Sequence, residues 1–230
     1  MKTPCPSPVA GSSTLGERIF ARWYPWLDRR AEPAGLGKLR ARALADVRGR
    51  TLEVGAGHGA NLAYYPPGAG PLVLTEPSAP MIAHLRVAAA GREASIVQAA
   101  AEALPFPDAS FDAVVTTLVL CSVDDPAAAL REIARVLADG GRFHFLEHVR
   151  AAEGSWLARA QDVSETPHRI IGGGCRPNRR TEATIRATPG LEITGLGAGR
   201  LPSLLPLVSP YIWGTAVRTA RASEAPRASP

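Results

Sequence analysis

Three glycines and an acid carry the residue types that hold an adenosine-bearing ligand. Residues 51–60 read Thr-Leu-Glu-Val-Gly-Ala-Gly-His-Gly-Ala, so Gly55, Gly57 and Gly59 directly follow a β-rich run. Glycine lets the backbone turn sharply and lets a ligand approach the main chain closely. Glu76 ends the next apolar run, where a carboxylate can accept hydrogen bonds from both hydroxyls of a ribose. A helix after the glycines would point its amide N–H groups at the same ligand.

Glu53 favours one ligand of this kind over another. Gly55, Gly57 and Ala60 fit the Gly-x-Gly-x-x-[Gly/Ala] pattern of dinucleotide sites, which is a weak signal on its own. A carboxylate two residues before the first glycine would repel a pyrophosphate, but it suits the ammonium group of a methionine moiety. The charge of Glu53 therefore favours a ligand with a methionine moiety over a dinucleotide, with Glu53 either binding its amino group or ordering the loop. A tight strand–helix turn without a ligand is the remaining alternative.

Short β-rich runs alternate with segments of helical periodicity along most of the chain. The expected strands are residues 51–54, 71–75, 95–99, 111–118, 142–147, 191–196 and 212–217. The expected helices are residues 17–27 (interrupted by Pro25), 34–47, 61–65, 79–90, 125–137, 156–163 and 180–188. This order predicts an α/β fold, namely a doubly wound, mostly parallel seven-stranded sheet of Rossmann-like type with an N-terminal helical cap. Ligands of such sheets bind at the carboxyl ends of the strands.

Length and charge narrow the class of partner. The chain has 230 residues and a formal net charge of +5. One domain is expected over residues 15–218, between disordered ends at 1–14 and 219–230. No apolar run reaches the ~18–20 residues of a membrane span, and the N-terminus has no secretory apolar region. Basic residues are not interleaved with aromatic ones, so we expect a small-molecule substrate and no nucleic acid.

The cysteines and one apolar stretch bear on the location of the protein. Cys5, Cys121 and Cys175 are widely spaced, with no Cys-x-x-Cys and no spacing typical of metal ligands. We expect reduced thiols, a cytoplasmic location and no metal site.

The leucine- and proline-rich residues 201–210 suit a loop over the site, a partner surface or a segment in peripheral contact with a membrane. The sequence leaves the oligomeric state open.

Over roughly residues 45–217 the chain resembles class I S-adenosylmethionine-dependent methyltransferases with a type 11 methyltransferase domain. The segments that carry the resemblance are Leu-Glu-Val-Gly-Ala-Gly-His-Gly at 52–59, Glu76, Ala-Glu-Ala-Leu-Pro-Phe at 101–106, Ser-Phe-Asp at 110–112 and the helix-turn at 131–141. The resemblance implies an enzyme that uses S-adenosylmethionine as methyl donor and forms S-adenosylhomocysteine.

A narrower resemblance rests on further segments. They are Thr-Leu-Val-Leu-Cys-Ser-Val at 117–123, Phe-Leu-Glu-His-Val at 145–149, Gly-Cys at 174–175, Tyr-Pro-Pro at 65–67 and Pro-Tyr-Ile-Trp-Gly at 210–214. They look like the methyltransferase-like proteins that methylate small alkyl thiols, some of which have an N-terminal apolar membrane anchor that this sequence does not show. Thiol S-methylation is the function that this resemblance implies. Related enzymes methylate quinone precursors or lipid amines, so a quinol, hydroxyl or lipid amine is the alternative acceptor. A non-catalytic S-adenosylmethionine-binding protein is a further alternative.

One departure from the resembled family concerns adenine. Relatives often place an aspartate at the end of the third strand to accept from the adenine amino group, and here that position is Ala100. Adenine recognition would then rest on backbone groups of Ala101 and Glu102, with the Glu102 carboxylate as a substitute acceptor. Thr117 and Leu118, at the end of the fourth strand, are expected beside the sulfonium, with core packing as the alternative.

Methyl transfer from a sulfonium is an in-line displacement that depends on alignment. A thiol acceptor must first ionise, because an unperturbed thiol has a pKa near ~8.5. His148, just past the fifth strand, is the expected catalytic residue, as base or substrate contact, and a histidine held by a backbone carbonyl is the alternative. His168 and His58 are the second and third choices. Cys121 reads as a packed apolar residue, and Cys175 as a structural residue or part of the site lining.

Overall fold

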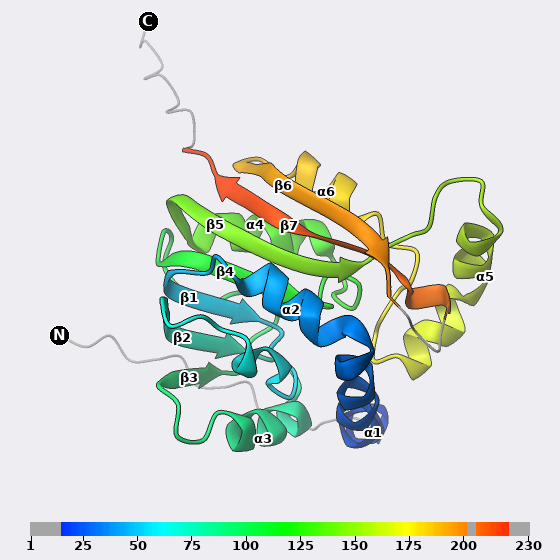
Figure 1. The fold of residues 1–230 in the computed structure, drawn as a ribbon, viewed down its shortest axis with the longest axis horizontal. Helices are drawn as coiled ribbons and strands as arrows, with labels where there is room; N and C mark the ends of the chain where they lie inside the picture. Colours follow the sequence, from blue (N-terminus) through cyan, green and yellow to red (C-terminus); the bar gives the residue numbers. More distant parts are fainter. Residues whose placement is uncertain (1–14, 202–205, 221–230) are drawn as a thin grey trace, which may run out of the picture.

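The structure is a computed structural model that describes residues 15–201 and 206–220. Of the expected disordered ends at 1–14 and 219–230, all but residues 219 and 220 lie outside the described residues. One seven-stranded sheet has the order β3-β2-β1-β4-β5-β7-β6 (Figure 1). Its strands are β1 Gly49–Val54, β2 Ala69–Thr75, β3 Ala94–Val97, β4 Phe111–Thr117, β5 Leu137–His148, β6 Leu191–Arg200 and β7 Pro210–Arg218. Strands β1 to β5 are parallel to one another, and β7 is antiparallel to both β5 and β6. The predicted mostly parallel, doubly wound sheet is confirmed.

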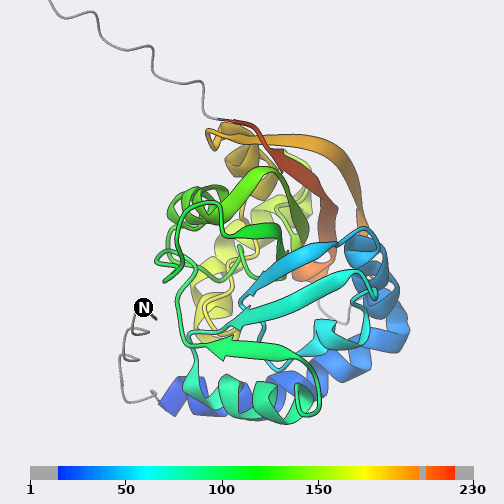
Figure 2. The ribbon, with the colours of Figure 1, turned by 90° about the vertical axis from the view of Figure 1, so that its left-hand side faces the viewer.

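The helices flank this sheet. They are α1 Leu15–Ala31, α2 Gly37–Leu44, α3 Ala79–Ala88, α4 Pro126–Val136, α5 Trp156–Ile171 and α6 Thr181–Ala187, with short turns η1 Glu32–Leu36, η2 Ala60–Ala63 and η3 Pro206–Val208. Figure 1 shows α1 and α5 beyond the carboxyl ends of the parallel strands. Figure 2 shows α1 alongside α3 at the β3 side of the sheet. In the part of the chain that the structure describes, no helix is long and apolar enough to cross a membrane.

Register aligns the ends of the central strands. Val54 of β1 pairs with Thr75 of β2 on one side and with Thr116 of β4 on the other. Thr117 pairs with Leu146 of β5. Because the carboxyl ends of parallel strands meet at one edge of the sheet, the residues that follow these strands face a common space. The glycine loop, Glu76, the end of β4 and His148 therefore share that edge.

Apolar residues on both faces of the sheet form the core. Leu52, Phe143 and Phe145 are fully buried, as expected for strands covered by helices on both sides. Helix α4 begins at a side-chain cap. The carboxylate of Asp125 accepts from the N–H groups of Ala127 and Ala128 and so caps the first turn of the helix. Its buried residues recur at helical spacing and end where β5 begins.

The predicted interruption of the first helix at Pro25 was wrong. Helix α1 is continuous through Pro25, which is buried within it, and the break comes later, at Gly35 of η1 with a φ of 127°. Proline removes one backbone hydrogen bond, but packing of the buried side of α1 outweighs that loss. The short helix expected at 61–65 is present as the single 3₁₀ turn η2 at Ala60–Ala63. Pro66 and Pro67 follow directly and end any helical run there.

Candidate active site

The glycine loop joins β1 to η2 and has a backbone that favours glycine. Gly55, Gly57 and Gly59 have φ values of 67°, 56° and 88°. A Cβ on Gly55 would lie 2.7 Å from Val119, and one on Gly59 would lie 2.9 Å from Ala88, so these glycines allow close packing. A Cβ on Gly57 would meet nothing within 4 Å. The main chain at Gly57 is therefore open to a ligand, as the sequence pattern predicts.

Glu76 closes this loop from the end of β2. Its Oε2 accepts from the N–H of Gly57 at 2.9 Å, and its Oε1 accepts from the N–H of Ser78 at 2.9 Å. Burial raises the pKa of Glu76, and the two backbone hydrogen bonds oppose that rise. Each carboxylate oxygen retains a lone pair for a ribose hydroxyl. The open main chain at Gly57 and this bidentate acid fit the ribose and methionine parts of S-adenosylmethionine.

Glu53 lies beneath the loop and is only 3% exposed. Its Oε1 accepts from Nδ2 of Asn61 at 2.9 Å, and its Oε2 accepts from the hydroxyl of Tyr65 at 2.8 Å. Burial raises the pKa of Glu53 to about 7, against the effect of these hydrogen bonds. This environment favours the loop-ordering alternative, and its contact with the donor's amino group stays a prediction.

A buried polar network ties the N-terminal helices to the loop. The guanidinium of Arg40 in α2 donates to both carboxylate oxygens of Asp28 at 3.0 and 3.2 Å and to Oδ1 of Asn61 at 2.9 Å. Asn61 in turn donates to Oγ1 of Thr117 at the end of β4, at 2.9 Å. Nε2 of His58 lies 3.0 Å from Asp28. No periodicity or motif in the sequence predicts this network, because its members come from four separate segments.

The chain turns abruptly after β4. Leu118 has a φ of 58°, a conformation that favours glycine, and its N–H donates to the carbonyl of Leu146 at 2.8 Å. Oε2 of Glu147, which is fully buried, accepts from the N–H groups of Val119 and Leu120 at 3.0 and 3.1 Å. Burial raises the pKa of Glu147 to about 7. Glu147 was not among the predicted site residues, yet it fixes the turn that lies beside the predicted sulfonium position.

The predicted adenine residues lie on the segment after β3. Ala101 is buried, and Leu104 packs with it in the main core. Oε1 of Glu102 accepts from the N–H groups of Asp124 and Asp125 at 2.9 and 3.3 Å. The Glu102 carboxylate thus orders the residues before α4. Its use as an adenine acceptor stays a prediction.

His148 ends β5 beside two sulfur atoms. Its Nε2 lies 2.9 Å from Sγ of Cys175, and these atoms lie with Sγ of Cys121 within 4.8 Å of one another. His148 is 5% exposed and Cys121 2%, whereas Cys175 is partly exposed. Burial alone would lower the pKa of His148, but Cys121 and Glu147 raise it overall. Spacing could not reveal this cluster, because the loop after β4, the end of β5 and the loop after α5 each supply one member.

The loop after α5 is held from two sides. A Cβ on Gly173 would lie 2.7 Å from the ring of Phe20 in α1. The N–H of Arg176 donates to the carbonyl of Cys121 at 2.9 Å. His168, near the end of α5, is half-buried, and burial together with the nearby His148 lowers its pKa. Helix α1 therefore covers the side of the site to which Cys175 belongs.

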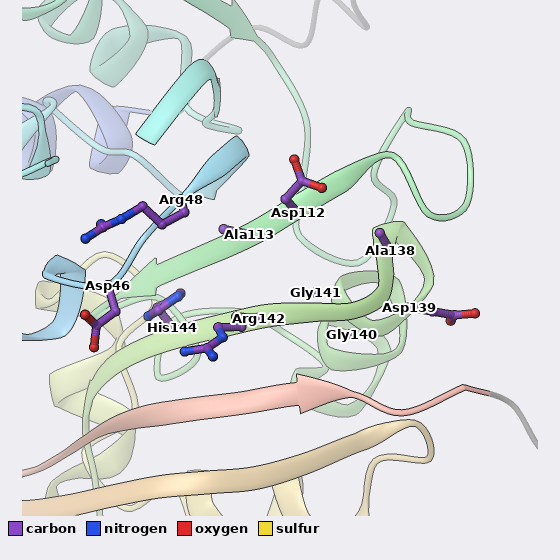
Figure 3. A pocket seen from close by; sticks show the side chains of 10 residues that line it. All are labelled: Asp46, Arg48, Asp112, Ala113, Ala138, Asp139, Gly140, Gly141, Arg142 and His144. Atoms are coloured by element: carbon purple, nitrogen blue, oxygen red, sulfur yellow. The ribbon is translucent and has the colours of Figure 1, made fainter. Parts of the chain in front are cut away.

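A separate hollow of about 470 Å³ lies at the other end of the sheet (Figure 3). Asp112, near the start of β4, lines it with Arg142 and His144 of β5. Burial, with the charge of Arg142, lowers the pKa of His144 to about 4. Residues of both charges line the hollow, and none of the predicted site residues does.

Comparison with known proteins agrees with this geometry. A family model described as "Methyltransferase domain" matches residues 52–145. The chain is 37% identical over 172 residues to the thiol S-methyltransferase TMT1B of Homo sapiens, covering 73% of this chain and 70% of that protein. It is 38% identical over 156 residues to the demethylmenaquinone methyltransferase of Roseiflexus castenholzii, and the match covers 61% of this chain and 65% of that protein.

Solved structures share the fold. A possible histamine N-methyltransferase from Thermotoga maritima matches with a TM-score of 0.64 at 23% identity, over 89% of this chain and all of that one. The [4+2]-cyclase SpnF matches with a TM-score of 0.68 at 20% identity, over 93% of this chain and 98% of that one.

Proposed function

The chain belongs to the class I S-adenosylmethionine-dependent methyltransferases, and from that premise we propose that its preferred acceptor is a small, apolar thiol. The observation that carries the proposal is the position of His148, whose Nε2 already contacts a sulfur atom at the carboxyl edge of the sheet. The identity to thiol S-methyltransferases, 36–37% over 73% of this chain, supports the same choice.

The cofactor-binding part of the proposal follows the strand ends. Bound S-adenosylmethionine supplies an activated methyl group on a sulfonium. The residues proposed to hold it are Glu53, Gly55, Gly57, Gly59, Glu76, Ala101, Glu102, Thr117 and Leu118. Glu76 accepts from the ribose hydroxyls while it keeps its hydrogen bond to Gly57. The turn at Leu118, fixed by Glu147, borders the reacting atoms.

His148 is the proposed catalytic residue. The acceptor thiol takes the place of Cys175 beside Nε2, and the imidazole receives its proton, which leaves a thiolate as nucleophile. This requires the tautomer with the proton on Nδ1, an atom that has no hydrogen-bond partner among the described residues. The buried, partly apolar surroundings exclude water and hold the thiolate in line with the methyl group.

A quinol is the second candidate acceptor. The similarity to the demethylmenaquinone methyltransferase of Roseiflexus castenholzii favours it. A hydroxyl or lipid amine would use the same donor site. Exposed apolar side chains on α1 and α5, among them Trp26, Trp156 and Ile170, support peripheral membrane contact as a way to meet an apolar acceptor. A cytoplasmic location remains a prediction.

The test is methyl transfer with a choice of acceptors. Purified protein receives S-adenosylmethionine with a labelled methyl group, together with alkyl thiols, a quinol and an ethanolamine lipid. We expect label on the thiols, loss of transfer in Glu76→Ala, and a large fall in kcat in His148→Gln. His84→Gln, an exposed histidine of α3, is the matched control. Label on the quinol or lipid alone would refute the thiol proposal.

A further inference from the structure

We propose that Cys121, His148 and Cys175 form a binding site for a thiophilic divalent cation of the zinc class. Each residue offers one ligand atom, two thiol sulfurs and one imidazole nitrogen, and the three atoms lie within 4.8 Å of one another. Soft sulfur ligands with one imidazole are the set that selects zinc and similar ions over magnesium or calcium.

The spacing of the ligand atoms suits an ion at their centre. Zinc binds sulfur at about 2.3 Å and imidazole nitrogen at about 2.0–2.1 Å, so tetrahedral ligand atoms lie roughly 3.5–4 Å apart. Nε2 of His148 and Sγ of Cys175 now lie 2.9 Å apart, and no pair in the cluster exceeds 4.8 Å. An ion needs only side-chain shifts of about an ångström to be bound.

The main chain around the cluster is already fixed. The Arg176 N–H bonds to the Cys121 carbonyl and so joins the two cysteine-bearing loops. A Cβ on Gly174 would lie 3.0 Å from the carbonyl oxygen of Ser122, which shows how closely these loops approach. Glu147 holds the residues just before Cys121. The ligands are therefore held before any ion arrives, which favours binding.

Charge and access also fit a cation. Binding replaces two thiol protons, which are released to solvent, by one divalent ion, so the loaded cluster of two thiolates, one imidazole and the ion is neutral. A neutral cluster suits Cys121 and His148, which are almost fully buried. Cys175 is partly exposed, so the cluster lies nearest to solvent at this residue. Three protein ligands leave a fourth position for solvent or a small thiol.

The inference has a consequence that rests on the proposed function. An ion at the cluster engages the lone pair of His148 Nε2, the atom proposed to receive the acceptor's proton. Zinc loading is therefore expected to slow thiol methylation, and a chelator is expected to restore it.

Cobalt(II) tests the site directly, because its absorption reports both geometry and sulfur ligation. Reduced, metal-free, full-length protein titrated with Co²⁺ should bind one equivalent, with the intense visible bands of a tetrahedral ion and near-ultraviolet thiolate-to-cobalt bands. Zn²⁺ should displace it. Cys121→Ser and Cys175→Ser should each reduce the thiolate bands and weaken Co²⁺ binding at least tenfold, and His148→Ala should weaken binding similarly.

Cys5→Ser is the matched control, since it removes a thiol while leaving all three proposed ligands in the chain. Circular dichroism checks that each variant is folded. Absence of thiolate-to-cobalt bands, or their persistence in the Cys121→Ser/Cys175→Ser double variant, would overturn the inference. If the cobalt bands appear but no thiol is methylated, the ion site is supported and the proposed thiol acceptor is refuted. If thiols are methylated but no ion binds, the proposed acceptor is supported and the ion site is refuted.

Discussion

The Arg40 guanidinium donates to both carboxylate oxygens of Asp28, at 3.0 and 3.2 Å, in a pair whose side chains are 5% and 3% exposed. Through Asn61 the same arginine reaches Glu53 and Thr117. The pair thus joins α1 and α2 to the glycine loop, because Asp28 also lies 3.0 Å from Nε2 of His58.

The first prediction concerns this buried pair. Asp28→Ala leaves the buried Arg40 charge with Glu32 as its remaining carboxylate partner, at 2.8 Å. Breaking a buried pair costs about 3–5 kcal/mol, so with Glu32 still in place the free energy of unfolding should fall by about 3 kcal/mol. Equilibrium unfolding in urea measures the free energy of unfolding of each variant. Arg131→Met is the control, because Arg131 and Asp125 form an exposed pair at 3.8 Å and such pairs contribute about 0–1 kcal/mol. Equal effects in the two variants would contradict the prediction.

The second prediction concerns Glu76. Glu76→Gln keeps the shape of the side chain but replaces one acceptor oxygen and the negative charge, so it disturbs the hydrogen bonds to Gly57 and Ser78 and those expected to ribose. Hydrogen bonds to charged groups contribute about 1.5–3 kcal/mol, so the Kd for S-adenosylhomocysteine should rise at least tenfold by calorimetry. Glu93→Gln, exposed before β3, should bind normally. Unchanged affinity in Glu76→Gln would remove Glu76 from the donor site.

The third prediction separates the glycines. Gly57→Ala and Gly59→Ala both place an alanine at positive φ, at roughly 1–2 kcal/mol each. Gly59→Ala adds contacts of 2.9 Å with Ala88 and 3.0 Å with Leu62, so it should lower the melting temperature more. Gly57→Ala projects a methyl group into open space and should mainly weaken S-adenosylhomocysteine binding. A larger loss of stability in Gly57→Ala would show that the loop packs differently.

The fourth prediction is a pH dependence of stability. Burial raises the pKa of Glu53 from 4.5 to about 7, so between these values the folded protein binds a proton that the unfolded chain has lost. The stabilising contribution is full below about pH 4.5 and is lost as the pH rises toward 7, by up to roughly 3 kcal/mol. Glu53→Gln should reduce the dependence of unfolding free energy on pH between 5 and 8, while Glu147, whose pKa burial also raises to about 7, keeps its own contribution. If the unfolding free energy of Glu53→Gln depends on pH as steeply as that of the parent protein, titratable groups other than Glu53 cause the dependence.

The residues that the sequence placed correctly are those whose roles are set locally. The strand ends, the glycine loop and the strand-end position of Glu76 follow from alternation, from glycine and from the topology of parallel sheets. Helix α4 was anticipated because Asp125 caps it and its apolar spacing is regular. Residues 53, 55, 57, 59 and 76 of the predicted set belong to such local patterns, as do Thr117 and His148 at the ends of β4 and β5.

Other features depend on long-range packing and left no local signal. Helix α1 crosses Pro25 because its buried face is held by the rest of the fold. The contact of Arg40 with Asp28 joins separate helices, and Glu147 reaches back to the turn after β4. Cys121, His148 and Cys175 meet only when three distant segments fold together, so their spacing in the chain resembles that of unrelated residues.

Helix α1 contacts both halves of the site. The ring of Tyr24 lies 6.2 Å from that of His58 in the glycine loop, and Phe20 packs against the Gly173 backbone beside Cys175. A displacement of α1 would therefore disturb the glycine loop and the Cys175 loop together. We expect a substitution that loosens α1 to affect both parts of the proposed site.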